Sequence, residues 1–234
     1  MTGPGDTAAF RLGYVPGVTP GKWARMWAER VPDVPLDLVT VTAADAEDAV
    51  RSGAVDAGVV RLPIDRTGLH AIPLYTETTV VVVPKDHVVT AAEQVTPGDL
   101  ADEIVLHPSD GTLVWAGDPP GSAAAHTPAT TAEAVELVAA GVGLLVVPQS
   151  LARLHHRRDL TYRPLVDGPE SSVVLTWPDA ETSDLMEQFI GIVRGRTVNS
   201  SRTPARAAER RPAAPAARPA KAGRRPARRG RPRR

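Results

Sequence analysis

Two threonine-bearing segments stand at the expected starts of helices, and both could hold an anion. The first is GVTPG, which contains Val18 and Thr19, and the second is ATTAE, which contains Thr130 and Thr131. The first turn of a helix offers free N–H groups and the positive end of the helix dipole, which suits a carboxylate. Threonine is also a common helix N-cap, so a purely structural role is the alternative for these side chains.

Three further positions are weaker candidates for contact with a ligand. Arg61 ends an expected strand and could pair with an anion, although a surface arginine is the alternative. His107 opens the segment HPSDGT, whose backbone N–H groups could face a ligand, with an ordinary Asp-Gly turn as the alternative. Trp115, a little further on, could line the same pocket or pack against the body of the protein.

Patterns that would indicate catalysis are missing from the sequence. The chain has no cysteine, which excludes thiolate catalysis and cysteine-ligated zinc. His155 and His156 are adjacent and would not share a helix face, so they are poor joint metal ligands. No G-x-S-x-G motif occurs, and the carboxylates form no paired motif. We therefore expect no catalytic residues, no metal, no cofactor and no enzymatic activity.

The C-terminal segment is strongly basic and could contact DNA. Of 27 Lys and Arg residues in the chain, 14 lie from Arg196 onward with one acid, Glu209, which leaves 13 basic and 26 acidic residues before them. The final RRGRPRR resembles an AT-hook, which lies in the minor groove of A·T-rich DNA. The residues expected to touch DNA are Arg228, Arg229, Gly230, Arg231, Pro232 and Arg233. An inert, solubilising tail is the alternative.

Localisation is expected to be cytoplasmic, without membrane contact. The start MTGPGDTAAF has neither the basic nor the apolar region of a secretory signal. No run reaches the ~18 apolar residues that a membrane span needs.

Strand and helix patterns alternate in the first part of the chain. FRLGYV, VPLDLVTV and VDAGVVRL read as strands, and AADAEDAVRSG reads as a helix. A helix with Thr19 as N-cap and Pro20 at its first position carries Trp23, Met26 and Trp27 at helical spacing. This β-α-β order predicts an α/β fold with parallel strands and helices packed on the sheet.

The alternation continues to about residue 196. IPLYTETTVVVVPKDH predicts two strands, VTPGDLAD a short helix and EIVLHPSDGT a strand and a turn. TTAEAVELVAAGVG is the clearest helix, with a capping-box pattern at Thr130 and Glu133. LLVVP, LTYRPLV and SSVVLTW follow as strands, and a last helix places Leu185, Phe189 and Ile192 in phase. The Arg/Pro/Ala-rich remainder, 197–234, is expected to be disordered, as is a flexible start at 1–8.

Five segments, in order and spacing, resemble the effector-binding domain of LysR-type transcriptional regulators. They are FRLGYVPG, RVPDVPLDLVTV, AVRSGAVDAGVVRLPIDRTGLHAIPLYTETTVVVVPKDH, VTPGDLAD and ATTAEAVELVAAGVGLLVVPQSLA. The resemblance implies the two-lobed fold of type 2 periplasmic binding proteins over residues 9–196. Lobe one would be about 9–84 plus 161–196 and lobe two about 85–160. The winged helix-turn-helix of full-length members is expected to be absent, since the first strand begins at Phe10.

The resemblance also implies a function. A small anionic effector would bind between the lobes, near the serine or threonine that family members carry at the starts of these two helices. Effector domains of this kind usually pair as homodimers, and Trp23, Met26 and Trp27 offer apolar surface for that. A sequestering protein with an inert tail, or an enzyme such as a dehydratase on the same fold, are the alternatives.

Overall fold

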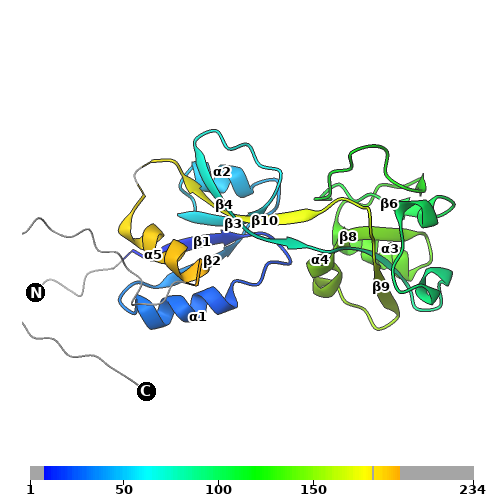
Figure 1. Ribbon diagram of the computed structural model, residues 1–234, viewed down its shortest axis with the longest axis horizontal. Helices are drawn as coiled ribbons and strands as arrows, with labels where there is room; N and C mark the ends of the chain where they lie inside the picture. The colour runs from blue at the N-terminus through cyan, green and yellow to red at the C-terminus, as the bar shows by residue number, and fades with distance from the viewer. Residues whose placement is uncertain (1–7, 181, 196–234) are drawn as a thin grey trace, which may run out of the picture. The chain divides into compact units, whose positions relative to one another are not determined.

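Two five-stranded sheets organise the part of the chain that the computed structural model describes, residues 8–180 and 182–195 (Figure 1). The chain divides into two units, 1–197 and 198–234, and the second lies outside the described residues. In chain order the elements are β1 (Phe10–Tyr14), α1 (Gly21–Arg30), β2 (Leu36–Thr40), α2 (Ala46–Arg51), β3 (Ala57–Arg61), β4 (Leu69–Glu77), β5 (Thr79–Pro84), the 3-10 helices η1 (Val88–Ala91) and η2 (Pro97–Leu100), β6 (Ile104–Leu106), β7 (Ser122–Ala123), α3 (Thr131–Ala139), β8 (Leu144–Pro148), α4 (Gln149–Leu154), β9 (Leu160–Pro164), β10 (Ser171–Pro178) and α5 (Asp184–Val193).

The first sheet has the strand order β2-β1-β3-β10-β4 and defines lobe one. Its first three strands pair in parallel, as the β-α-β pattern predicts, whereas β10 runs antiparallel to both β3 and β4. Figure 1 shows α1 and α5 on one side of this sheet and α2 on the other. Lobe one is therefore a sheet covered on both faces.

The second sheet has the order β7-β6-β8-β5-β9 and defines lobe two. β6 pairs in parallel with β7 and β8, while β5 lies antiparallel between β8 and β9. One face packs against α3 and α4, and the other packs against η1 and η2. The chain thus enters lobe two with β5 and leaves it after β9.

The boundary between the lobes differs from the one expected from the sequence. The sequence placed 79–84 and 161–164 in lobe one, but β5 and β9 pair only with strands of the second sheet. Thr78 separates β4 from β5, and residues 165–170 separate β9 from β10. A run of apolar strand residues reads the same in either sheet, because strand pairing is not encoded in periodicity.

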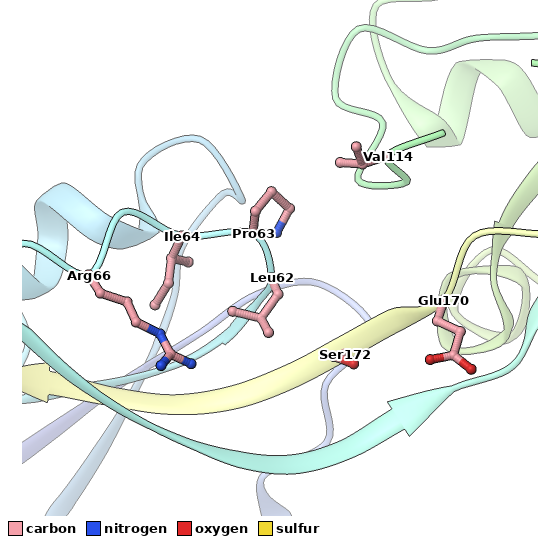
Figure 2. A pocket seen from close by; sticks show the side chains of 7 residues that line it. All are labelled: Leu62, Pro63, Ile64, Arg66, Val114, Glu170 and Ser172. Atoms are coloured by element: carbon pink, nitrogen blue, oxygen red, sulfur yellow. The ribbon is translucent and has the colours of Figure 1, made fainter. Parts of the chain in front are cut away.

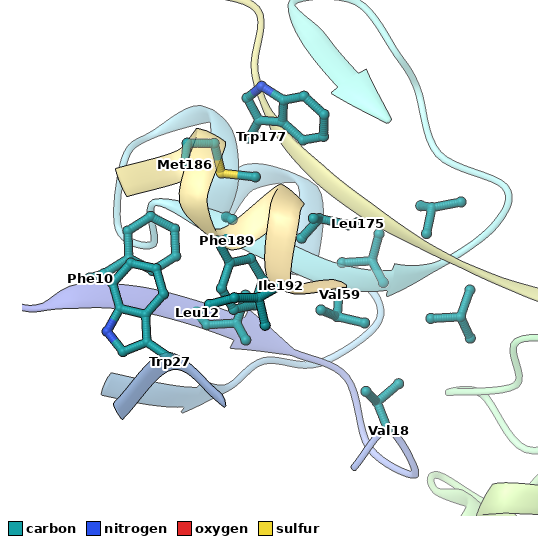
Figure 3. Close-up of a cluster of buried hydrophobic side chains, with 14 of the residues drawn as sticks. Phe10, Leu12, Val18, Trp27, Val59, Leu175, Trp177, Met186, Phe189 and Ile192 are labelled. Carbon is teal, nitrogen blue, oxygen red and sulfur yellow. The ribbon is translucent and has the colours of Figure 1, made fainter. Parts of the chain in front are cut away.

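An aromatic cluster anchors α1 and α5 to lobe one (Figure 3). Phe10 stacks on Trp27 with ring centroids 4.9 Å apart, and Phe189 lies 5.5 Å from Phe10 and 5.9 Å from Trp27. The indole N–H of Trp27 donates to the carbonyl oxygen of Val34 at 2.7 Å. Trp27 therefore belongs to the core, and its polar atom is satisfied there.

Candidate functional site

A cavity of about 150 Å³ lies in lobe two, next to the first residue of α3. Its wall is mostly apolar and comes from the end of β6, the loop after it, the end of β8 and the start of α4. The apolar lining residues are Leu106, Pro108, Leu113, Trp115, Val146, Val147, Pro148 and Leu151. His107, Thr112 and Thr131 supply the polar side chains. An apolar pocket with a few converging polar groups is the usual form of a small-molecule site.

Thr131 directs two donors at one carboxylate oxygen. Its backbone N–H and its hydroxyl both donate to Asp110 Oδ1, at 2.7 and 2.8 Å. Thr131 is buried and is the first residue of α3, while Asp110 belongs to the exposed turn after β6. The helix dipole favours a negative charge at this position. Thr131, which the sequence singled out, is therefore placed to hold a carboxylate and already holds that of Asp110.

Thr130 has a different task from its neighbour. Its exposed side chain caps α3 by accepting from the backbone N–H of Glu133 at 3.1 Å. Glu133 does not close the capping box on Thr130. It accepts from the N–H of Ala129 at 2.7 Å instead, and that hydrogen bond is the main cause of its lowered pKa. The side chain of Thr130 is therefore a helix N-cap, which is the purely structural role expected as the alternative to ligand contact.

His107 and Thr112 share the cavity with Thr131. Partial burial lowers the pKa of His107, because burial disfavours the charged imidazolium. The hydroxyl of Thr112 is buried and has no hydrogen-bond partner among the residues that the structure describes. A polar atom of this kind offers an incoming ligand a hydrogen bond at little desolvation cost.

The two Nη atoms of Arg61 are bonded within the protein rather than presented to solvent. Its Nη1 donates to the carbonyl oxygen of Pro16 at 2.7 Å, and its Nη2 donates to Ser150 Oγ at 2.8 Å. Glu77 lies 3.4 Å from Nη2 and accepts from the Ser150 hydroxyl at 2.7 Å. Both charged side chains are buried. The expected anion partner of Arg61 is thus present, but it is a residue of the same chain.

Val18 and Thr19 lie apart from the cavity. Val18 is buried in the core of lobe one, and Thr19 is exposed. α1 begins at Gly21 with Pro20 as its N-cap residue, one position later than expected, and no side chain caps it. The structure therefore brings His107 and Thr131 together, and leaves Thr19 and Val18 outside the residues that line the lobe-two cavity.

A second hollow, of about 350 Å³, opens beside the end of β3 (Figure 2). Leu62, Pro63 and Ile64 line one side, and Figure 2 shows Val114 of lobe two on the opposite side. Arg66 and Glu170, both exposed, complete the rim together with Ser172. The charged groups of this hollow are exposed to water, whereas the polar side chains of the lobe-two cavity are buried or half-buried.

The sequence also carried expectations about metal binding, membrane crossing and DNA contact. Within residues 8–180 and 182–195, no group of three or more His, Asp or Glu side chains is arranged to hold a metal ion. In the same part of the chain, no helix has the length and apolar character to cross a membrane. The expected DNA contacts from Arg228 to Arg233 lie outside the described residues.

Sequence reasoning missed the roles of Asp110, Glu77 and Ser150. The sequence indicates either a ligand-facing loop or an ordinary Asp-Gly turn at Asp110, and nothing in the local pattern indicates that its carboxylate reaches a helix 21 residues later. Glu77 and Ser150 are 73 residues apart and meet only through the fold. No local signal could have paired them.

The LysR substrate binding domain model matches residues 5–197 of the chain. The Hca operon transcriptional activator HcaR of Escherichia coli K12 is 25% identical, over 79% of this chain and 67% of that protein. The HTH-type transcriptional regulator AlsR of Bacillus subtilis 168 is 28% identical, over 60% of this chain and 49% of that protein. The chain thus spans about half to two thirds of the length of these curated relatives.

A solved structure supports the same fold. The BenM effector binding domain with its effector benzoate has 23% identity and a TM-score of 0.68, covering 80% of this chain and 91% of that one. At this identity the likeness shows the fold alone. It confirms the two-lobed, type 2 periplasmic-binding-protein-like architecture that the sequence predicts.

Proposed function

This chain belongs to the LysR substrate binding domain family, and we propose that it binds a small carboxylate in the lobe-two cavity at the start of α3. The relatives are named as transcriptional activators and regulators. We accordingly assign a binding role to the chain, without catalysis, in the control of transcription.

One observation carries the choice of a carboxylate. Asp110 Oδ1 accepts from both the N–H and the hydroxyl of Thr131 at hydrogen-bonding distance, so a carboxylate oxygen fits this position. Hydrogen bonds to a charged group are worth about 1.5–3 kcal/mol, roughly twice those between neutral groups. A ligand carboxylate that takes the place of Asp110 gains the same two donors and the same helix end.

The apolar wall of the cavity determines the chemical character of the remainder of the ligand. Leu113, Trp115 and Leu151 face the cavity together with the end of β8, so burial of a hydrophobic group adds to affinity. An aromatic or branched aliphatic acid combines both features. Benzoate, the effector named for BenM, is a ligand of this chemical type.

A thermal-shift screen tests the proposal. The purified chain is heated with small aromatic and aliphatic acids, with their primary amides and with the corresponding amines. Because a ligand that binds only the folded state raises the midpoint of unfolding, acids should raise it and the matched amides should do so much less. A library in which only amines or neutral compounds stabilise the chain would overturn the choice of a carboxylate.

We also propose that two copies pair and that the tail contacts DNA. For pairing, the support is the apolar surface of α1 and of the edge strand β2, where Leu38 and Val39 are exposed. Trp23 and Met26 are partly buried against the core, and Trp27 is fully enclosed, so only the first two can contribute. For DNA contact, the support is the concentration of arginine from Arg196 onward.

A further inference from the structure

A buried polar network joins the two lobes at one point. Arg61 ends β3 and Glu77 ends β4, both in lobe one, whereas Ser150 is the second residue of α4 in lobe two. The hydroxyl of Ser150 accepts from Arg61 Nη2 at 2.8 Å and donates to Glu77 Oε2 at 2.7 Å. The side chains of Arg61 and Glu77 are only 2% and 7% exposed. The serine hydroxyl therefore stands between the two charges.

Contact between the two charges themselves is long. Nη2 of Arg61 lies 3.4 and 3.5 Å from the carboxylate oxygens of Glu77, beyond the usual 2.7–2.9 Å of such a pair. The Nε of Arg61 is buried and has no partner among the residues that the structure describes. The guanidinium thus keeps one unused donor next to an incompletely paired carboxylate. A buried donor in this condition is costly, and any rearrangement that satisfies it is favoured.

Gly17 leaves room for the serine. It has a φ of +86°, and a Cβ at this position would lie 2.6 Å from Ser150 Oγ and 2.9 Å from Arg61 Nη2. A side chain at this position would collide with both partners of the contact between Ser150 and Arg61. The loop after β1 is therefore shaped to admit the lobe-two hydroxyl.

We propose that Ser150, Arg61 and Glu77 form a two-state latch between the lobes. In the closed state, which the structure shows, Ser150 bridges the two charges. In the open state Ser150 withdraws with lobe two, and Glu77 closes on the Nε–Nη2 edge of Arg61 as a bidentate pair. Because each buried charge keeps a partner in both states, opening does not leave an unpaired ion, which is the usual obstacle to separating a buried network.

The latch lies beside the lobe-two cavity. Leu151, the next residue of α4, lines that cavity, and so does Pro148 at the end of β8. A ligand that contacts Leu151 and moves or immobilises α4 also moves or immobilises Ser150, which is the preceding residue. Occupancy of the cavity then biases the two states of the latch, which is the physical requirement for coupling a ligand to a conformational change.

Spin-label distance measurements test the latch without any ligand. The chain has no cysteine, so Asp48→Cys in lobe one and Val88→Cys in lobe two provide two unique labels at highly exposed side chains. Labelled protein is diluted into unlabelled protein so that only distances within one chain are recorded. The distance distribution is compared for the parent, Ser150→Ala, Glu77→Gln and the exposed control Ser122→Ala.

The two network substitutions should act in opposite directions. Ser150→Ala removes the bridge of the closed state and should raise the ratio of open to closed molecules about tenfold. Glu77→Gln keeps an acceptor for Ser150 but cannot form the charged fork of the open state, so it should leave that ratio at or below the parent value. Ser122→Ala should match the parent.

Two results would overturn the latch. One is an unchanged distribution in Ser150→Ala, and the other is a loosening of the same sign in both network variants, which a static network would give. If Glu77→Gln does not fold, the comparison of Ser150→Ala with Ser122→Ala decides alone. A rise in the open population supports the latch, and no rise refutes it.

Discussion

At the scale of single residues, Asp110 and Thr131 illustrate how one contact serves structure and binding at once. The carboxylate of Asp110 satisfies the first N–H of α3, which would otherwise lack a partner at the helix start. The same carboxylate occupies the position proposed for a ligand. Asp110 therefore caps α3 and would compete with the proposed anionic ligand.

Asp110→Ala separates these two roles. Loss of the carboxylate should lower the free energy of unfolding by about 0.5–2 kcal/mol, the usual cost of losing a helix cap. It should also strengthen the binding of a small acid, because the ligand no longer displaces an internal carboxylate. Denaturant titration and calorimetry measure the two effects. Asp118→Ala, an exposed aspartate of the same loop, is the control and should change neither.

Glu77 should matter far more for stability than a surface acid. Glu77→Ala leaves the guanidinium of Arg61 buried beside no anion, and removing one partner of a buried pair costs about 3–5 kcal/mol. Urea denaturation measures the loss. Glu93→Ala, at an exposed position without a hydrogen-bond or ion-pair partner among the described residues, is the matched control. Equal stability of the two variants would contradict the burial described for the pair.

Stability should also depend on pH through His107. Burial lowers its pKa in the folded protein, so the unfolded chain binds a proton more readily between the folded pKa and the ordinary value near 6.5. This contribution is fully present above pH ~6.5 and is lost as the pH falls through the unfolded value toward the folded one. His107→Gln should flatten that part of the curve of unfolding free energy against pH. An unaltered curve would show that His107 is not the group responsible.

At the scale of elements, local patterns predicted most of the helices and strands but not α4, η1 or β7, and they predicted the pairing of the strands less well. The helix over 131–139 was expected from its apolar face, and Thr130 caps it as predicted. In α5 the buried residues include Met186 besides Phe189 and Ile192, whereas Leu185 is only partly buried. The inward face is set by α1 and the sheet, which the sequence of α5 does not specify.

The sequence predicted only those residues of the site that a local motif marks. Thr131 and His107 could be named from a helix start and a strand end. The capping of Thr131 by Asp110, the burial of Arg61 with Glu77 and the bridging serine each join residues far apart in the chain. Such contacts depend on how strands pair, which hydrophobic periodicity does not encode.

The aromatic cluster of Phe10, Trp27 and Phe189 predicts that α5 stabilises lobe one. Phe189→Ala removes a fully buried ring that contacts both Phe10 and Trp27, and the cavity left behind should cost about 3–5 kcal/mol. Val88→Ala, which is 75% exposed, should have little effect. Chemical denaturation measures the change in the free energy of unfolding of both variants. A loss below about 1 kcal/mol for Phe189→Ala would show that α5 packs loosely, since the surrounding residues could then refill the space.

At the scale of the whole molecule, the charge is divided between two parts of the chain. The part before Arg196 carries twice as many acidic as basic residues, and the remainder is almost purely basic. A duplex titration of the full chain and of a chain ending at Gly195 tests the proposed DNA contact. Binding should be lost on truncation and should fall with salt, with a log–log slope of about −0.9 per phosphate neutralised. Equal binding by both chains would place the contact elsewhere.

The most direct test of the central claim is calorimetric titration of a small acid into three proteins: the parent, Thr131→Val and Thr130→Val. The adjacent threonines make a matched pair, because Thr131 directs its hydroxyl to the carboxylate position while the hydroxyl of Thr130 accepts from Glu133. Loss of a hydrogen bond to a charged group costs about 1.5–3 kcal/mol. With Asp110→Ala introduced into all three proteins, so that no internal carboxylate already uses this hydroxyl, Thr131→Val should weaken the acid about tenfold or more, with Thr130→Val close to the parent. Equal affinity of the parent and Thr131→Val would contradict a carboxylate site at the start of α3.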